Sequence, residues 1–300
     1  MILDNEYFNR LPMTGWYPGH MLKAGRQMQE ALRLVDLVVE LVDARAPLAT
    51  RNPILRRLLD DKPFLMVVNK SDLADPQVSK KWDAWYQQKG IQTFFLDSQK
   101  VGNVRGLTQI WRHMVIEARK KRGATRPLMR PVRLMIVGIP NIGKSTLVNR
   151  LHEKNKAQMG PKPGVTRQTQ WIVLSDDVEL LDTPGVMWPK VRNKCHELLL
   201  TVLGNIRDEV MGVSMPAEFL AWQLLELNRE EVWSALGLKE SPHEYMDILH
   251  GVAERRGLLQ KGGGLDLERA SVVLLKEFRD GHLGRTTFEF PPCSEDAAVV

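Results

Sequence analysis

The sequence predicts an α/β protein, in which a mostly parallel sheet with helices on both faces is followed by a small all-helical domain. Short apolar runs of β-strand type alternate with longer amphipathic stretches over roughly the first two thirds of the chain. After Pro189 the strand pattern stops, and the remaining sequence is typical of helices interrupted by proline and glycine. These observations place the start of the helical domain near residue 191.

All the strands expected in the sheet are short and of buried type. They fall at residues 37–42, 64–68, 93–96, 134–137, 171–174 and 178–181. Before the first strand, apolar residues recur with helical spacing, which predicts an amphipathic helix packed on the sheet. Its apolar face comprises Met21, Ala24, Met28, Ala31 and Val35.

In the helical domain, proline and glycine mark the expected helix breaks at Pro216, Gly237, Pro242 and residues 262–264. The last helix is expected to bury one apolar face against the rest of the domain. That face comprises Leu267, Ala270, Leu274 and Phe278.

The composition excludes several classes of protein. The chain has 300 residues, 43% of them hydrophobic and 26% charged, so it can form a core without staples. Cys195 and Cys293 lie far apart, which argues against a disulfide framework or a cysteine zinc site. We expect a cytoplasmic protein, because no import signal is visible and no apolar run approaches the roughly 18 residues of a membrane helix.

The charge gives only a weak indication of a partner. A net charge of +6 is compatible with binding RNA. Basic residues are densest at residues 119–122 and continue through Arg126, Arg130 and Arg133. This run fits an RNA-binding surface and a solvated linker equally well.

Residues 138–145 have the pattern G-x-x-x-x-G-K-S of a phosphate loop, with an apolar strand before it and a helix-compatible run after it. Backbone N–H groups of such a loop surround phosphates, Lys144 adds a positive charge, and Ser145 can hold Mg²⁺. The residues expected to bind the nucleotide here are Asn141, Ile142, Gly143, Lys144, Ser145 and Thr146.

Two later segments are candidates for γ-phosphate sensing. Asp182-Thr183-Pro184-Gly185 ends a strand, where Asp182 can hold Mg²⁺ through water and the Gly185 N–H can meet the γ-phosphate. Thr166 ends a glycine- and proline-rich stretch and could close on Mg²⁺ and the γ-phosphate. The alternatives are an ordinary turn and a plain loop.

Asn69-Lys70-Ser71-Asp72 ends another strand and has the pattern that recognises guanine. The Asp72 carboxylate can accept hydrogen bonds from N1 and the exocyclic amine of guanine, a donor pair that adenine lacks. Ser98 follows the next strand, where a loop N–H could meet guanine O6. The alternative is a capped turn with Asp72 as a helix cap.

The guanine motif, residues 69–72, precedes the phosphate loop, which reverses the order of an ordinary GTPase. The motifs in this order resemble those of the circularly permuted P-loop GTPases. We therefore expect an N-terminal extension over residues 1–19, a permuted GTPase domain over 20–190 and a helical, RNA-binding domain over 191–300.

Within that class the chain resembles the ribosome biogenesis GTPase A (YlqF) family, through residues 16–21, residues 185–190 and the helical tail. The resemblance spans nearly the whole chain. It implies GTP hydrolysis with Mg²⁺, slow alone and stimulated by the ribosomal subunit. It also implies binding to the precursor of the large (50S) subunit late in assembly, with ribosomal RNA contacted by the helical domain. We expect a monomer that binds neither membrane nor DNA.

Val186 follows Gly185, where Ras-like GTPases carry the glutamine that orients the attacking water. Valine cannot hydrogen-bond a water, and the resemblance implicates His20 instead. Asn141 resembles the phosphate-loop asparagine that ligates K⁺ in potassium-stimulated GTPases, although a structural turn residue is an equal alternative.

Two other functions remain open: a non-catalytic, GTP-binding RNA-binding protein, and a permuted GTPase of the small subunit. The inverted motif order also suggests a mechanism. The chain runs from Gly185 through Val186 directly into the helical domain, so the γ-phosphate could move that domain. His20 would lie on a short N-terminal segment free to enter the site.

Overall fold

The computed structural model describes residues 5–14, 29–52, 55–59, 62–99, 106–156, 171–181, 191, 193–228, 230–238 and 240–292. They form two compact units. The sheet unit draws on residues 17–72 and 79–189, and the helical unit on residues 1–16, 73–78 and 190–297.

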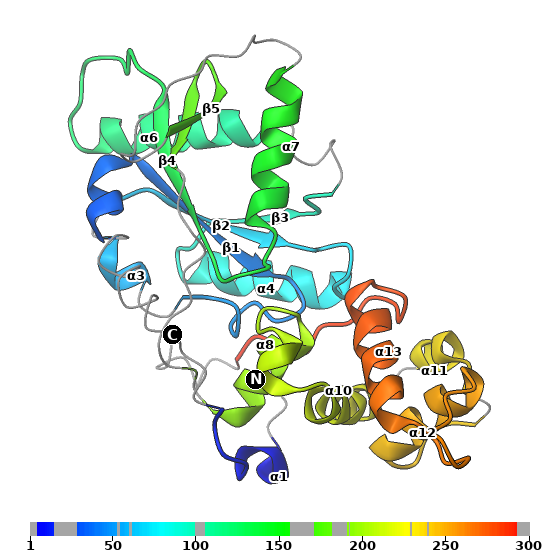
Figure 1. Ribbon diagram of the computed structural model, residues 1–300. Coiled ribbons are helices and arrows are strands. Elements are labelled where there is room, and N and C mark those ends of the chain that lie inside the picture. Colours follow the sequence, from blue (N-terminus) through cyan, green and yellow to red (C-terminus); the bar gives the residue numbers. More distant parts are fainter. Residues whose placement is uncertain are drawn as a thin grey trace. The chain divides into compact units, whose positions relative to one another are not determined.

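The sheet unit contains a six-stranded sheet in the order β3-β2-β1-β4-β6-β5 (Figure 1). All neighbouring strands are parallel except β5 and β6, which are antiparallel. The strands are β1 (Leu37–Asp43), β2 (Phe64–Asn69), β3 (Thr93–Leu96), β4 (Val132–Val137), β5 (Trp171–Ser175) and β6 (Val178–Leu181). The six predicted strands are thus confirmed, with ends that differ by at most two residues.

The strand order reverses at the centre of the sheet. From β1 the chain proceeds outward to β2 and β3, and then returns through helix α6 (Leu107–Lys121) to β4 on the other side of β1. In open parallel sheets, ligands bind beyond the carboxyl ends of the strands at such a point. The guanine motif follows β2 and the phosphate loop follows β4, so both motifs lie at this edge.

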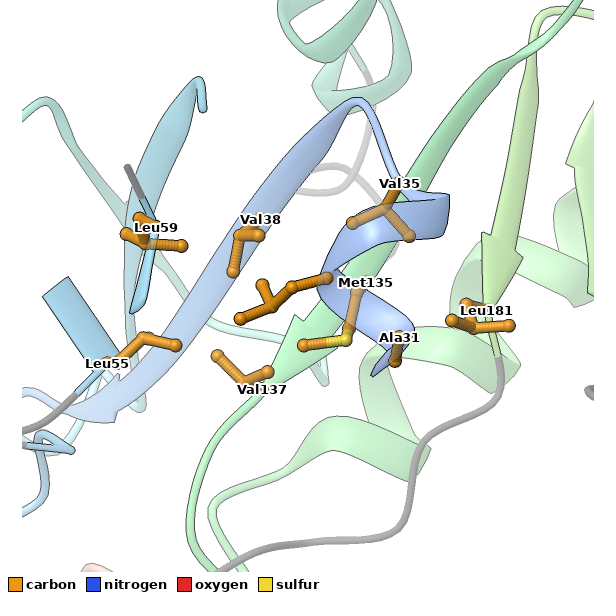
Figure 2. Close-up of a cluster of buried hydrophobic side chains, with 9 residues drawn as sticks. Ala31, Val35, Val38, Leu55, Leu59, Met135, Val137 and Leu181 are labelled. Carbon is orange, nitrogen blue, oxygen red and sulfur yellow. The ribbon is translucent and has the colours of Figure 1, made fainter. Parts of the chain in front are cut away.

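One face of the sheet packs against the helical residues 29–34 and helix α3 (Leu55–Leu58) (Figure 2). Strand register places Val38, Met135 and Leu181 side by side across β1, β4 and β6, and all three are buried in this cluster. Ala31 and Val35 are buried against them, as the predicted apolar face requires. Met21, Ala24 and Met28 of that face lie outside the described residues.

Two further helices lie wholly or mostly in the sheet unit, which contains helix α4 (Pro76–Gln88) from Ser79 onward. Helix α4 packs Trp82, Trp85 and Tyr86 against one another, with ring centroids 5.1 to 5.4 Å apart. Helix α7 (Lys144–Lys156) begins at the phosphate loop. Because a helix N-terminus carries partial positive charge, α7 presents a favourable end to phosphate.

The helical unit contains α1 (Glu6–Asn9), α8 (Lys194–Val202), α9 (Asp208–Met211), α10 (Ser214–Leu227), α11 (Glu230–Leu236), α12 (Tyr245–Arg255) and α13 (Leu267–Arg279). Helix α13 buries Ala270, Leu274 and Phe278 of the predicted face, while Leu267 is half-buried. Gly237 ends α11, and Pro242 precedes α12, as expected.

The expected break at Pro216 is wrong, because this proline lies inside the first turn of α10. A proline is tolerated there, since the first N–H groups of a helix have no partner within the helix. Among the described residues, none of the helices has the length and apolar character needed to cross a membrane.

Residues 5–14 pack against α8 and α10 within the helical unit. Phe8 is 1% exposed, and its ring packs against that of Phe219 at a centroid distance of 5.2 Å. The Thr14 backbone N–H and the Lys194 ammonium both bond the buried Glu197 carboxylate, at 3.2 Å and 2.9 Å. Residues 5–14 are therefore packed within the helical unit, whereas His20, the residue expected to enter the site, lies outside the described residues.

Residues 73–78 also belong to the helical unit. The Leu73 carbonyl accepts a hydrogen bond from the Thr286 N–H at 2.9 Å, and the Asp75 N–H donates to the Thr287 hydroxyl at 3.0 Å. The segment that follows Asp72 is thus bonded to the chain beyond α13.

Candidate functional site

The phosphate loop connects β4 to α7 and has the backbone geometry that its glycines allow. Asn141 and Gly143 adopt positive φ angles of 57° and 106°. A Cβ atom on Gly143 would lie 2.3 Å from Asn69 Nδ2, so only glycine fits. Gly138 is also constrained, because a Cβ there would lie 2.9 Å from the Leu41 carbonyl oxygen.

Asn69, the last residue of β2, joins three predicted parts of the site. Its amide nitrogen donates to the Ile142 carbonyl of the phosphate loop at 2.9 Å. Its amide oxygen accepts from the backbone N–H of Ser98 at 3.1 Å. Asn69 is 1% exposed, so these bonds are shielded from water. The guanine motif, the Ser98 loop and the phosphate loop are therefore connected through one side chain.

Lys144 begins α7, and its ammonium lies over the start of the phosphate loop. It donates to the carbonyl oxygens of Gly138 and Ile139 at 2.9 Å and 2.8 Å. Burial lowers the pKa of Lys144 to about 8, because the charged form loses hydration. The lysine still carries its proton at neutral pH and can attract phosphate.

The other predicted residues differ in exposure. Ile142 and Ser98 are buried, Asp72 is half-buried, and Asn141, Ser145 and Thr146 are exposed. Exposed groups at the start of α7 can receive a ligand, whereas the buried groups shape the loop. His20, Thr166, Asp182 and Gly185 lie outside the described residues.

An ionic cluster beside the guanine motif was missed in the sequence. Asp43, the last residue of β1, forms ion pairs with Arg45 at 2.8 Å and with Lys70 at 3.1 Å. A carboxylate at the end of a largely apolar strand, at the edge where the other motifs lie, was the available signal. It is a weak signal, because such residues often only cap a turn.

Taken together, a phosphate loop after β4, a guanine motif after β2 and a sheet with its order reversed between β1 and β4 define a circularly permuted P-loop GTPase. The family model described as "50S ribosome-binding GTPase" matches residues 133–228.

Curated relatives cover nearly the whole chain. Ribosome biogenesis GTPase A of Bacillus cereus is 39% identical, over 92% of this chain and 93% of its own length. Mitochondrial ribosome-associated GTPase 1 of Bos taurus is 34% identical, over 90% and 86%. The crystal structure of GNP-bound YlqF from T. maritima is 29% identical with a TM-score of 0.59, over 90% of this chain and 98% of that one. The chain belongs to the ribosome biogenesis GTPase A family and is a GTPase.

Proposed function

We propose that this GTPase binds the precursor of the large (50S) ribosomal subunit and hydrolyses GTP late in its maturation. The family model and the relatives support the ribosomal partner by the names they carry. The observation that carries the nucleotide part is the Asn69 side chain, which bonds both the phosphate loop and the Ser98 loop. These bonds hold the guanine motif and the Ser98 loop at a fixed distance from the phosphate loop.

The nucleotide would be held by residues 69–72, Ser98 and the phosphate loop. Asp72 would recognise guanine, and Lys144 would neutralise the outer phosphates. The exposed Ser145 at the start of α7 would hold Mg²⁺. Thr166 and Asp182 of the predicted switches, which lie outside the described residues, would be its other ligands. When bound, Mg²⁺ supplies positive charge to the phosphates. Gly185 would sense the γ-phosphate.

Hydrolysis needs a group that orients water, and Val186 has no hydrogen-bonding atom in its side chain. We assign this role to His20. His20→Ala should lower GTP turnover more than about tenfold while GDP affinity stays nearly intact, as expected for general acid–base or water-orienting groups. Unchanged turnover in the presence of ribosomal subunits would remove His20 from the mechanism.

Asn141 is the candidate ligand for K⁺. It is exposed, and its positive φ of 57° is one that asparagine adopts readily in turns, so a structural turn residue is the alternative. A potassium ion there would add charge where negative charge develops during hydrolysis. Turnover should be several-fold faster in KCl than in NaCl at equal ionic strength, and equal rates would exclude this role.

The helical unit is proposed to contact ribosomal RNA, but some of its basic residues have partners within the protein. Arg279 pairs with Asp208 and also bonds the carbonyls of Thr201 and Val202. Arg256 pairs with Glu277 at 2.6 Å. Lys261, Arg269 and Lys276 are exposed and are better candidates for phosphate contacts.

The nucleotide state would be transmitted to the helical unit along the chain. One connection is the predicted switch from Gly185 through Val186. A second follows Asp72 directly, since residues 73–78 are bonded to the chain beyond α13. A flexible insert within residues 186–193 should weaken the coupling between GTP and subunit binding, and coupling that survived intact would favour the second connection.

Co-sedimentation tests the proposed function. The full chain is mixed with large-subunit precursors, mature large subunits or small subunits, each with GDP, GTP or a non-hydrolysable analogue, and phosphate release is measured in parallel. We expect nucleotide-dependent binding to the large-subunit precursor and faster multiple turnover with it. Binding to small subunits alone would overturn the subunit assignment. Binding without turnover would favour the non-catalytic alternative.

A further inference from the structure

Lys70, the second residue of the guanine motif, contacts a carboxylate from outside the motif. Its ammonium lies 3.1 Å from Asp43 Oδ2. Lys70 has a positive φ of 58°, which turns the chain sharply after β2. Its side chain is 23% exposed, whereas that of Asp43 is fully buried. Lys70 thus lies between a buried negative charge and the surface of the site.

The Asp43 carboxylate is itself held in place from several directions. Arg45 donates to both of its oxygens, through Nε at 3.0 Å and Nη2 at 2.8 Å, and through its backbone N–H at 3.0 Å. The Asp43 backbone N–H donates to the Thr50 hydroxyl at 2.9 Å. Because the planar guanidinium binds both carboxylate oxygens, the Asp43 carboxylate has little freedom to rotate.

The cluster keeps Asp43 ionised despite its burial. Burial by itself would raise the pKa of Asp43, but the positive charges of Arg45 and Lys70 outweigh it and hold the pKa well below its usual range. Burial lowers the pKa of Lys70, and the Asp43 carboxylate opposes that shift. The pair therefore keeps Asp43 ionised, while the pKa of Lys70 remains lowered by burial despite the nearby carboxylate.

The backbone also joins the cluster to the guanine motif. Asp43 is the direct register partner of Asn69 in the β1–β2 pair. The Ala44 N–H donates to the Asn69 carbonyl at 2.9 Å. A displacement of Asp43 would therefore also displace Asn69, which connects the guanine motif to the phosphate loop.

We propose that Asp43, fixed by Arg45, is a positioning residue for guanine-nucleotide binding, which acts by holding Lys70 in its nucleotide-receiving conformation. This rests on the proposed guanine site. Lys70 stands between Asn69 and Asp72, and its ion pair with Asp43 orders its long side chain before the base is bound. A lysine ordered in advance loses less conformational freedom on binding. Asp43 and Arg45 thus contribute to affinity from outside the sequence motif.

A double-mutant cycle on the full chain tests the proposal, with the dissociation constant of GDP as the readout. Lys70→Ala should weaken GDP binding about tenfold or more, and Asp43→Asn alone about tenfold. The double variant should bind GDP no more weakly than Lys70→Ala. This non-additivity is the signature of an effect transmitted through Lys70, and a merely structural role would not produce it.

Glu40→Gln is the matched control. Glu40 is another buried carboxylate on β1, and it bonds Arg51 Nε at 3.3 Å and the Asn52 N–H at 2.7 Å. This variant should change thermal stability but leave GDP affinity within about twofold. If Asp43→Asn does not fold, Arg45→Lys replaces it in the cycle, because one ammonium cannot hold both carboxylate oxygens.

The outcomes separate the inference from the function on which it rests. Unchanged GDP affinity in Lys70→Ala would overturn both the guanine site and the role of Asp43. A weakened Lys70→Ala with additive effects of Asp43→Asn, or with no effect of Asp43→Asn, would overturn the inference and leave the guanine site standing.

Discussion

Each unit contains a buried carboxylate paired with a lysine, and the two pairs differ in how much of the lysine reaches the surface. In the sheet unit, Lys70 beside Asp43 keeps 23% of its side chain exposed. In the helical unit, Lys194 beside Glu197 keeps only 4%. A partly exposed lysine can still contact a ligand, whereas a fully buried lysine can interact only with other groups of the protein.

The remaining bonds of the two pairs show the same contrast. Asp43 is fixed by Arg45, which lies only two residues further along the chain. Glu197 and Lys194 instead bond Thr14, which is distant in sequence and ends the described N-terminal segment. The comparison teaches that burial of an ion pair does not by itself reveal its role. The first pair should set nucleotide affinity, and the second should set stability.

The largest effect is expected from Glu197→Ala. It leaves the Lys194 ammonium buried without its counter-charge, which typically costs about 3–5 kcal/mol of unfolding free energy. Urea denaturation followed by circular dichroism measures this loss, and GDP affinity measured on the folded fraction should be unchanged. As a control, Glu6→Ala removes an exposed carboxylate paired with Arg10 and should leave stability unchanged. A Glu197→Ala protein of normal stability would contradict the stabilising role of the Lys194–Glu197 pair.

Gly143→Ala should have the next largest effect, which is a loss of affinity for GDP. The added Cβ would collide with the Asn69 amide, and φ of 106° is strained for any residue with a side chain. We expect GDP affinity to fall about 100-fold, measured by fluorescence titration. Gly90→Ala is the matched control, because Gly90 has a φ of 68° with nothing within 4 Å of the added Cβ. Gly90→Ala should lose some stability and no affinity.

Much of this sheet could be predicted from sequence, because its strands follow local hydrophobic patterns and its motifs are contiguous. The Asn69 bridge is consistent with those motifs, since both segments end at the same edge. The Asp43–Lys70 pair was missed because the β1–β2 register creates it, and no spacing in the sequence encodes that register.

The packing of residues 5–14 could not be predicted for a similar reason. Phe8 and Thr14 meet Phe219 and Glu197 only through tertiary contacts. The Pro216 error had a local cause, because a proline within the first turn of a helix and one that breaks a helix look alike until the helix start is known.

A third prediction concerns pH and the phosphate end of the site. The pKa of Lys144 is about 8 in the free protein, and bound phosphates favour the charged lysine and so raise its pKa. Above pH 8, binding must therefore take up a proton, and GDP affinity should fall by up to about tenfold per pH unit. Below that pH this lysine contributes no slope.

Isothermal titration in buffers of different ionisation enthalpy, between about pH 7 and 9, measures the proton uptake directly. In Lys144→Arg the guanidinium stays charged throughout this pH range. The remaining GDP affinity of this variant should therefore not depend on pH above 8. Glu197→Ala should retain the wild-type slope, because Lys144 and not the Lys194–Glu197 pair takes up the proton. A flat wild-type profile would show that Lys144 stays charged across this range.

The smallest effect is expected from Thr14→Val, which tests the stabilising role of the Lys194–Glu197 pair in the helical unit. The variant keeps the side-chain shape but removes the hydroxyl that accepts from Lys194 at 3.0 Å, while the Thr14 N–H still bonds Glu197. Stability should fall by about 1 kcal/mol, the usual worth of one such hydrogen bond. Because the three residues form one network, the cost of Thr14→Val should change when Glu197 is already alanine. A loss of GDP affinity in Thr14→Val, with stability intact, would mean that the Lys194–Glu197 pair takes part in nucleotide binding after all.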